Sequence, residues 1–293
     1  MLNRVWLRMS GLPPEVIKSL KEFLREDIRT GDVTTEAMEP LKADAVGTMF
    51  AKDKAIFAGV KEVKAIAEIS GLTCELLAFE GNWVGPQEPV LRLGGSARTL
   101  LNIERVCLNI VQRMSGIATK TFKMMELVRE GSSKVVVAAT RKTTPGFRYF
   151  EKRAVIVGGG DPHRYALDDM VLIKNNHIAV VGGIAEAIRA ARDSVSFSKK
   201  ISCEVRSLSE AIEAVQSGAD IILLDNFKPK DVEKTHKVLT EKGLRERVLL
   251  ETSGGINENN IRDYAASGTD IISSGALTHS YTSSDFNILI SLV

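Results

Sequence analysis

The sequence contains little cysteine, and its cysteines form no recognisable pattern. Cys74, Cys107 and Cys203 are its only three cysteines, and they are far apart with no C-x-x-C pair among them. Disulfide frameworks and structural zinc sites need paired or closely spaced cysteines. The sequence therefore predicts neither of these features, and it favours a reducing, cytoplasmic location.

Long apolar runs are also lacking. The apolar residues after Arg4 and Arg8 are interrupted by Gly11, Pro13 and Pro14, whereas a secretory signal has an unbroken apolar core. No run approaches the roughly 20 apolar residues of a membrane-spanning helix. We expect neither a signal peptide nor a membrane partner.

Net charge is nearly absent as well. The 39 Lys and Arg residues almost balance the 37 Asp and Glu residues, which leaves a formal charge of +2. Proteins that bind nucleic acids through phosphate contacts usually carry a concentrated basic excess. We therefore expect no nucleic-acid partner, and any anion-binding site must be a local cluster of cations.

What the sequence does contain is typical of a globular protein with a sizeable core. Hydrophobic residues make up 44% of the chain and charged residues 26%. A chain of 293 residues fits two domains, or one large barrel with an extension.

The first third of the chain predicts a small α+β domain. Apolar residues at helical spacing predict an amphipathic helix that begins at Pro14. Three β-prone runs (47–50, 74–79 and 89–93) then surround one helical segment (60–69). An apolar stripe over residues 99–114 predicts a long helix that leads out of this domain.

From about Gly116, apolar β-prone runs alternate with helical segments, which is the pattern of βα units around a parallel sheet. The predicted strands are 134–139, 170–173, 200–205, 220–224, 248–251 and 270–273; helices between them include 183–192, 208–217 and 229–241. Near-continuous apolar strands of this kind are buried on both faces. Periodicity alone leaves a barrel and an open doubly wound sheet both possible.

Polar residues or glycine turns stand at the end of each predicted parallel strand. In chain order they are Thr140, Arg141 and Lys142; Lys174; Glu204; Asp225; Ser253, Gly254 and Gly255; and Ser274, Gly275 and Ala276. Barrels of this class build their active sites from residues at the carboxyl ends of the strands. The sequence thus predicts that cations, carboxylates and glycine turns share one rim.

The cations and the glycine turns favour a site for anions. Arg141 offers a planar fork for a carboxylate and Lys142 a compact charge, although a solvated basic loop is the alternative. Lys174 and Arg164, in neighbouring segments, add to the same polarity. Two glycine turns after the last two strands favour phosphate binding through backbone N–H groups, although either turn alone could be a plain connection.

The two carboxylates allow several roles. Glu204 and Asp225 could stabilise positive charge on a sugar, hold ribose hydroxyls or position hydrated Mg²⁺ that a pyrophosphate carries. Asp225 also fits a helix cap. Carboxylate-pair glycoside hydrolysis fits poorly, because cations outnumber acids at the rim.

Taken together, these residues resemble the motifs of the quinolinate phosphoribosyltransferase family over nearly the whole chain. The segments that carry the resemblance are Glu26-Asp27, Gly31 to Thr35, Glu104-Arg105, Leu108-Asn109, Ser115 to Thr119, Thr140 to Gly146, Leu172 to Lys174, Asn176 to Ile178, Leu224 to Asn226, Ser253 to Gly255 and Gly275 to His279.

The resemblance implies a fold and an assembly. The α/β fold would be an N-terminal α/β sandwich domain, residues 1–114 joined by 280–293, packed on an incomplete TIM-like barrel, residues 115–279. The chain would form a homodimer with a shared active site, or a higher oligomer, and Arg105 would reach into the partner's site.

The resemblance also implies a reaction. The phosphoribosyl group of phosphoribosyl pyrophosphate (PRPP), which carries Mg²⁺, would be transferred to quinolinate with loss of CO2. The products would be nicotinate mononucleotide and pyrophosphate, in NAD biosynthesis. The implied roles are quinolinate binding for Arg105, Arg141, His163, Arg164 and Lys174; catalysis for Lys142, Glu204 and Asp225, the last two near the Mg²⁺ without a dedicated metal site; and phosphate binding for Ser253, Gly254, Gly255, Ser274, Gly275 and His279.

The sequence departs from the usual family pattern in three places. Asp161-Pro162 precedes His163-Arg164 where Asn-His-Arg is more usual, Asn175 replaces a common Asp, and Ser202 and Arg206 replace acids that flank Glu204. Three alternatives follow: a nicotinate phosphoribosyltransferase of the same fold, a Schiff-base lyase that uses Lys142 or Lys174, and a non-catalytic phosphate-binding paralogue.

Overall fold

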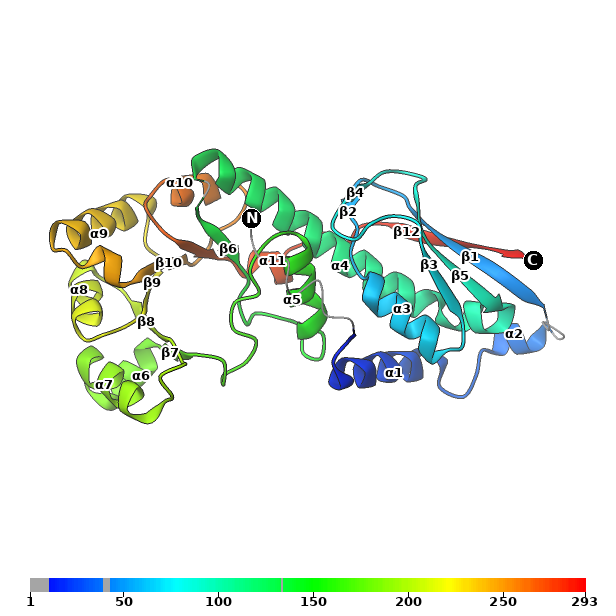
Figure 1. Ribbon diagram of the computed structural model, residues 1–293, viewed down its shortest axis with the longest axis horizontal. Helices are drawn as coiled ribbons and strands as arrows, with labels where there is room; N and C mark the ends of the chain where they lie inside the picture. The colour runs from blue at the N-terminus through cyan, green and yellow to red at the C-terminus, as the bar shows by residue number, and fades with distance from the viewer. Residues whose placement is uncertain (1–10, 39–42, 133) are drawn as a thin grey trace. The chain divides into compact units, whose positions relative to one another are not determined.

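The computed structural model describes residues 11–38, 43–132 and 134–293, which form two compact units (Figure 1). The first unit comprises the described residues of Met1–Phe122 together with Thr144–Gly159 and Tyr281–Val293. The second comprises Lys123–Thr143, again as far as described, and Gly160–Ser280. The predicted division after residue 114 falls inside a helix, and Thr144–Gly159 belongs to the first unit.

A four-stranded antiparallel sheet organises the first unit. Its order is β12 (Phe286–Leu292), β1 (Asp44–Ala51), β5 (Pro89–Ser96) and β3 (Thr73–Leu76). From Ala45 onward, fully buried residues of β1 alternate with partly exposed ones, as expected for a sheet with one covered face. The C-terminal strand β12 completes the sheet at its edge, next to β1.

Helices cover this sheet, and their apolar stripes explain why. In α1 (Pro14–Ile28) the residues Val16, Leu20 and Leu24 are buried, so the predicted amphipathic helix is confirmed. The predicted helix α3 (Val60–Ile69) is also confirmed. The unit further contains α2 (Val33–Ala37), α5 (Arg148–Val157) and a small two-stranded sheet of β2 (Ala55–Ile56) and β4 (Trp83–Val84).

The long helix α4 corrects one sequence-based prediction. It was expected to end near Met114, with a change of structure at Gly116, but it spans Ala97–Gly131. Gly116 lies inside the helix, at the point where the backbone of Thr282 and Ser283 packs against it. A Cβ at that position would overlap the Thr282 carbonyl oxygen and lie 2.9 Å from Ser283 Cα. The glycine therefore permits a close approach and does not break the helix.

A six-stranded parallel sheet organises the second unit. Its order is β6 (Val136–Ala138), β11 (Ile271–Ser273), β10 (Leu249–Ser253), β9 (Ile221–Asp225), β8 (Ile201–Val205) and β7 (Val171–Ile173). All six strands overlap the predicted ones, and every residue of β8 is buried, as expected for a strand covered on both faces. Strands β6 and β7 are the two edges, so hydrogen bonds do not close the barrel.

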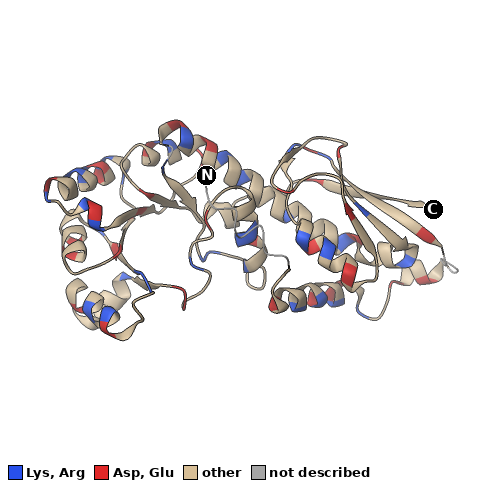
Figure 2. Ribbon diagram, in the orientation of Figure 1, with Lys and Arg blue, Asp and Glu red and all other residues tan. Residues whose placement is uncertain are grey.

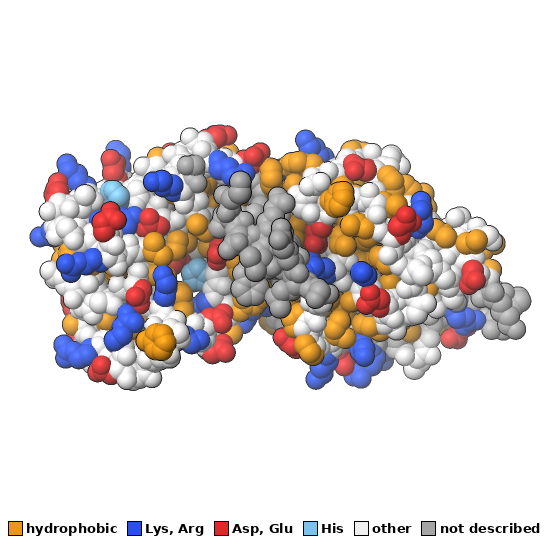
Figure 3. Space-filling view, viewed as in Figure 1, with side chains coloured by type: hydrophobic (Ala, Val, Ile, Leu, Met, Phe, Trp, Pro, Cys, Tyr) orange, Lys and Arg blue, Asp and Glu red, His pale blue; other side chains and the backbone are white. Residues whose placement is uncertain are grey.

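The helices of this unit follow the strands, and α7 to α10 lie along the outside of the curved sheet (Figure 1). The helices are α6 (Asn175–Val181), α7 (Ile184–Ser194), α8 (Leu208–Gln216), α9 (Pro229–Glu241), α10 (Ile261–Ala265) and α11 (Ala276–His279), with a 3-10 turn at Arg245–Arg247. Helices α7 and α9 carry charges of both signs (Figure 2). On the face seen in Figure 3, the two signs are interspersed over both units.

The predicted fold class is confirmed: a mixed α/β protein with an antiparallel-sheet unit and a parallel-sheet unit. Within the described residues, no helix combines the length and the apolar character that crossing a membrane requires.

Candidate active site

The register of the parallel sheet brings the predicted site residues to one edge. Ile173 pairs with Cys203 and Val205 with Leu224, so that Lys174 follows β7 level with Glu204. Further along the sheet, Asp225 pairs with Ser253 and Ser253 with Ser273. Because all six strands run in the same direction, their carboxyl ends and the residues that follow them form one rim.

Glu204 lies among several charged or polar groups on this rim. The Asn175 amide donates a hydrogen bond of 2.6 Å to Glu204 Oε1, and Lys174 Nζ is 3.9 Å from Oε2. Burial, and then the neighbouring charge of Asp225, raise the pKa of Glu204, although Lys174 opposes this shift. The charge of Asp225 thus acts on Glu204, and a pair of interacting carboxylates can share a cation or face a developing positive charge.

Asp225 is held at the end of β9 by its neighbour Asn226. The Asn226 amide donates to Asp225 Oδ2 over 2.8 Å, and its backbone N–H donates to Ser253 O over 2.9 Å. Asn226 has a left-handed φ of 58°. Gly254, with a φ of 101°, lies so close that a Cβ would overlap the Asn226 side chain. The first glycine turn is thus packed against the residue that positions Asp225.

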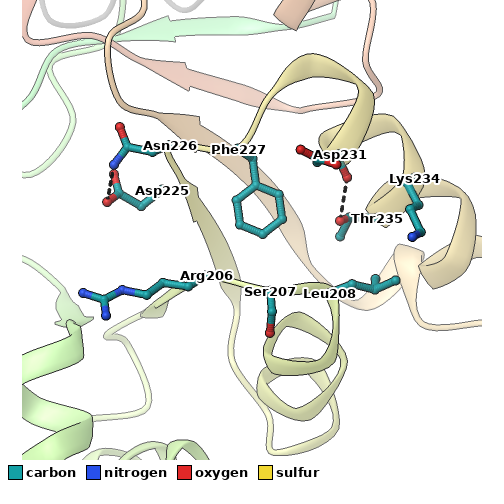
Figure 4. Close-up of a pocket in the computed structure, with 9 residues that line it drawn as sticks. All are labelled: Arg206, Ser207, Leu208, Asp225, Asn226, Phe227, Asp231, Lys234 and Thr235. Atoms are coloured by element: carbon teal, nitrogen blue, oxygen red, sulfur yellow. Dashed lines mark hydrogen bonds between the residues drawn. The ribbon is translucent and has the colours of Figure 1, made fainter.

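A cavity of about 300 Å³ opens beside Asp225, where α8 and α9 begin (Figure 4). In Figure 4, Arg206 and Asp225 lie at one end of this cavity and Lys234 at the other. Of the residues predicted for the site, only Asp225 lines it. The full lining is Arg206, Ser207, Leu208, Asp225, Asn226, Phe227, Asp231, Lys234 and Thr235.

On another part of the rim, cationic side chains gather around one buried carboxylate. Burial, and then the charge of nearby Arg141, lower the pKa of Arg164, whereas Glu251 acts in the opposite direction. Glu251 also lies 3.3 Å from His163 Nε2. Arg141 Nε is buried and has no hydrogen-bond partner. We call Arg141, His163, Arg164 and Glu251 the cation cluster.

The loop that carries His163 and Arg164 is fixed to the sheet by Asp161. Its backbone N–H donates to Val137 O over 2.8 Å, and its carbonyl accepts from Ala139 N over 2.9 Å. Asp161 Oδ1 accepts a 2.6 Å hydrogen bond from the His163 N–H. The unusual Asp161 therefore anchors the histidine loop beside β6.

Lys142, Gly275 and His279 come together between the ends of β6 and β11. A Cβ at Gly275 would lie 2.9 Å from both Lys142 Cδ and His279 Nε2. The Thr278 hydroxyl donates to the Lys142 carbonyl over 2.7 Å, which ties this loop to α11. The structure thus joins a predicted catalytic lysine to the predicted phosphate loop.

The serines of the two glycine turns have structural partners. Ser253 Oγ donates to Ser273 O over 3.2 Å, and Ser274 Oγ donates to Ile256 O over 2.7 Å. The Gly255 carbonyl accepts hydrogen bonds from the Asn257 and Asn260 amides. Both hydroxyls hold the turns in shape.

Arg105 lies on α4 in the first unit, and its side chain is exposed. All the other predicted site residues belong to the second unit. His177, also noted in the sequence, accepts a 2.8 Å hydrogen bond from the Lys174 N–H at Nδ1 and thereby caps α6. In the part of the chain that the structure describes, no three His, Cys, Asp or Glu residues are grouped to hold a metal ion.

Four residues near the predicted site were not assigned a role from the sequence: Asp161, Asn175, Asn226 and Glu251. Glu251 left a detectable signal, because it is an acid in an otherwise apolar strand and a buried charge needs a partner. Asp161 and Asn175 were noted only as departures from the family pattern. Asp161 bonds to the backbone of β6 and of its own loop, and Asn175 donates to the Glu204 side chain, so neither partner could be read from the local sequence.

Comparison with known proteins agrees with this arrangement. The model of the quinolinate phosphoribosyl transferase N-terminal domain matches residues 32–115, and that of the C-terminal domain matches residues 117–289. The chain belongs to the quinolinate phosphoribosyltransferase family. The resemblance inferred from the sequence motifs is thereby confirmed.

Individual relatives support the same assignment. The probable carboxylating nicotinate-nucleotide pyrophosphorylase of Archaeoglobus fulgidus is 45% identical over 258 residues, which cover 88% of this chain and 97% of the relative. The human carboxylating nicotinate-nucleotide pyrophosphorylase is 38% identical over 280 residues, covering 94% and 92%. The crystal structure of NadC from Streptococcus pyogenes has a TM-score of 0.89 at 36% identity, covering 97% of this chain and 100% of that one.

Proposed function

We propose that this protein transfers the phosphoribosyl group of PRPP to quinolinate and releases CO2 and pyrophosphate, which yields nicotinate mononucleotide for NAD biosynthesis. One observation carries the substrate assignment. Arg141 has a buried Nε without a partner and lies near Arg164, so two guanidinium groups share a partly enclosed site with a surplus of positive charge. A planar dicarboxylate matches that charge and offers bidentate acceptors to both.

The cation cluster would hold the pyridine ring. Arg141, Arg164 and His163 supply donors to the two carboxylates of quinolinate. Nicotinate has one carboxylate and would leave part of this charge unmatched, which is unfavourable for buried groups. The cluster therefore favours quinolinate over nicotinate.

The carboxylate pair would face the sugar. Glu204 and Asp225 are close enough for their charges to interact, and Lys174 lies beside Glu204. As the bond from the sugar to pyrophosphate breaks, positive charge develops on the ribose, and adjacent carboxylates stabilise it. Lys174 would balance the negative charge of the leaving group.

The same two carboxylates fit the Mg²⁺ that accompanies PRPP. Magnesium prefers oxygen ligands and usually binds through one or two carboxylates together with substrate phosphates. Bound Mg²⁺ would supply charge neutralisation for the pyrophosphate. The raised pKa of Glu204, caused by burial and by Asp225, is the property that a nearby cation would reverse.

The glycine turns would bind the 5′-phosphate. Backbone N–H groups of Gly254, Gly255 and Gly275 can approach an anion closely, and Lys142 and His279 converge at Gly275. Held at both ends, the sugar and the pyridine nitrogen would be aligned for attack, which accounts for much of the rate in such transfers. Decarboxylation then follows from the positive charge on the pyridine ring.

The active protein would be a homodimer that shares its sites, and we place it in the cytoplasm. The exposed Arg105 of one subunit would serve the cation cluster of the other. Mixing two inactive variants, Arg105→Ala and Arg141→Ala, tests this arrangement, because each hybrid dimer would regain one intact site. Random pairing predicts about a quarter of wild-type activity. No recovery in mixtures shown to exchange subunits would contradict a shared site.

The function itself is tested with purified protein, Mg²⁺ and PRPP, with quinolinate and nicotinate offered in parallel. Formation of nicotinate mononucleotide and CO2 from quinolinate alone is expected. Arg141→Ala should abolish product formation. Arg192→Ala should not, because this arginine lies on α7 and its guanidinium pairs with Asp220. Product from nicotinate alone would contradict the proposed substrate. Product from neither would favour a non-catalytic phosphate-binding protein.

A further inference from the structure

Glu251 is a buried carboxylate that lies within the candidate site but was not assigned a role in it. It belongs to β10, and only 2% of its side chain is exposed. Its carboxylate oxygens lie 3.3 Å from His163 Nε2, and 12% of the histidine side chain is exposed. An ionised carboxylate is tolerated in such surroundings only with a partner. The partner here is a residue proposed to contact the substrate.

The contact makes Nε2 of the histidine ring the hydrogen-bond donor. An ionised carboxylate can only accept hydrogen bonds, so His163 Nε2 must carry a hydrogen and donate it to Glu251. This leaves Nδ1 as the ring atom available to a ligand.

The backbone of His163 is held as well. It adopts a left-handed φ of 54°, which is uncommon for a residue other than glycine, and its N–H donates to Asp161 Oδ1. Two acidic residues thus restrain His163, one at the main chain and one at the ring. Restraint at both ends is typical of a side chain whose direction matters for binding.

We infer that Glu251 is a positioning residue that acts on the pyridine dicarboxylate through His163. The inference rests on the proposed function. A substrate carboxylate that meets Nδ1 needs a donor there, so the bound ring must carry both hydrogens. The charge of Glu251 stabilises that doubly protonated ring between two carboxylates. The negative charge of Glu251 also stabilises the charged form of Arg164, whereas the positive charge of Arg141 destabilises it.

A double-mutant cycle tests the inference. Glu251→Gln preserves size and removes the charge, and His163→Ala removes the ring through which it would act. Glu251→Gln alone should weaken quinolinate binding, measured by calorimetry, and kcat/KM for quinolinate by roughly 10- to 100-fold. In the His163→Ala background the same change should cost no more than about twofold. The KM for PRPP should stay unchanged throughout.

Asp270 offers a matched control. It accepts hydrogen bonds of 2.7 Å from Arg245 and from the Leu250 N–H, where β10 and β11 begin. Asp270→Asn should lower the melting temperature without a selective effect on quinolinate. Equal losses for both substrates in Glu251→Gln, as for a general loss of stability, would overturn the inference. So would unchanged or tighter quinolinate binding, or an equal effect in both backgrounds.

If Glu251→Gln does not fold, nitrogen-15 NMR of the unsubstituted protein can test the inference instead, by detecting whether His163 Nε2 carries a hydrogen. The chain has only four histidines, so the His163 signals can be assigned with His163→Ala. A hydrogen on Nε2 in slow exchange with water supports the inference, and an unprotonated Nε2 contradicts it. Wild-type protein that does not turn over quinolinate would contradict the proposed function, whereas active wild type with an unaffected Glu251→Gln contradicts only this inference.

Discussion

Each unit of the protein contains a cluster of charged groups around at least one buried carboxylate, and the two clusters differ in how well their charges are matched. In the first unit Arg153 lies between two carboxylates, 3.2 Å from Glu62 Oε2 and 2.6 Å from Glu80 Oε2. Glu80 also accepts hydrogen bonds from the backbone N–H groups of Gly59 and Val60, at the start of α3. Lys61 lies near the same two carboxylates, so cations and acids are matched there, and the cluster ties α3 and α5 to the turn that carries Glu80.

The cation cluster of the second unit carries a surplus of basic groups. His163 contacts Glu251, the charges of Glu251 and Arg141 both act on Arg164, and the Arg141 Nε has no partner. Glu62 Oε1 in the first cluster also has no hydrogen-bond partner, so an unpaired buried atom does not by itself distinguish the two clusters; the surplus of cations and its position at the rim do. The comparison teaches that buried charge alone does not mark a binding site, whereas an unmatched surplus of one sign at a rim does.

The largest effect on stability is expected from Arg153→Ala, which breaks the first cluster. Arg153→Ala leaves Glu62 and Glu80 buried without their cation, and loss of one partner of a buried pair costs about 3–5 kcal/mol. We expect a matching fall in the free energy of unfolding, measured by urea denaturation. Arg92→Ala, in a comparable but exposed pair, is the control. A change below about 1 kcal/mol for Arg153→Ala would show that the cluster is not structural.

The second largest effect is expected on activity, from a substitution that breaks the cation cluster without unfolding the protein. Arg141→Ala should lower kcat/KM for quinolinate at least about 100-fold, equivalent to roughly 2.7 kcal/mol of transition-state binding. Its melting temperature should stay within a few degrees of wild type, because Arg141 Nε satisfies no group of the protein. Steady-state kinetics and thermal unfolding of one preparation separate the two quantities. A large loss of stability with little loss of activity would reverse the contrast between the clusters.

The third effect concerns pH and the first unit alone. Burial, and then the neighbouring Glu80, raise the pKa of Glu62 to about 7 against the opposing charge of Arg153. The folded protein thus binds this proton more tightly than the unfolded chain does. The resulting stability is fully present below pH about 4.5 and is lost as the pH rises through about 7.

This contribution should amount to on the order of 2 kcal/mol between pH 5 and pH 8. Urea denaturation across that range measures it, with Glu62→Gln as the comparison, since the amide does not titrate. Identical pH dependence in the variant and the wild type would exclude Glu62 as its source.

The smallest effect is expected at an ion pair that is exposed but otherwise comparable to the buried pairs of Arg153. Arg92 Nη1 lies 2.7 Å from Glu75 Oε2, but about half of each side chain is exposed, 47% and 59%. Arg92→Ala should change the free energy of unfolding by less than about 1 kcal/mol. High salt should reduce even this difference. An effect as large as that of Arg153→Ala would mean that pairing matters more than burial.

Much of the fold and of the candidate site could be predicted from the sequence. All six parallel strands and the helices α1, α3 and α9 lie where the apolar spacing placed them. The polar residues after those strands do meet at one rim, because parallel strands share a direction. Other features depended on contacts between distant residues. The length of α4 was missed because Gly116 is explained only by the chain at Thr282.

The sequence by itself determined the six parallel strands, the apolar faces of the main helices and the residues that follow the strands, since the spacing of apolar residues is a local property. Only the tertiary structure decided the order of the strands, the place of β12 beside β1, and the contact of Glu251 with His163, 88 residues apart. The physical reason is that a buried charge must find a partner, but nothing in its own segment specifies which residue that will be.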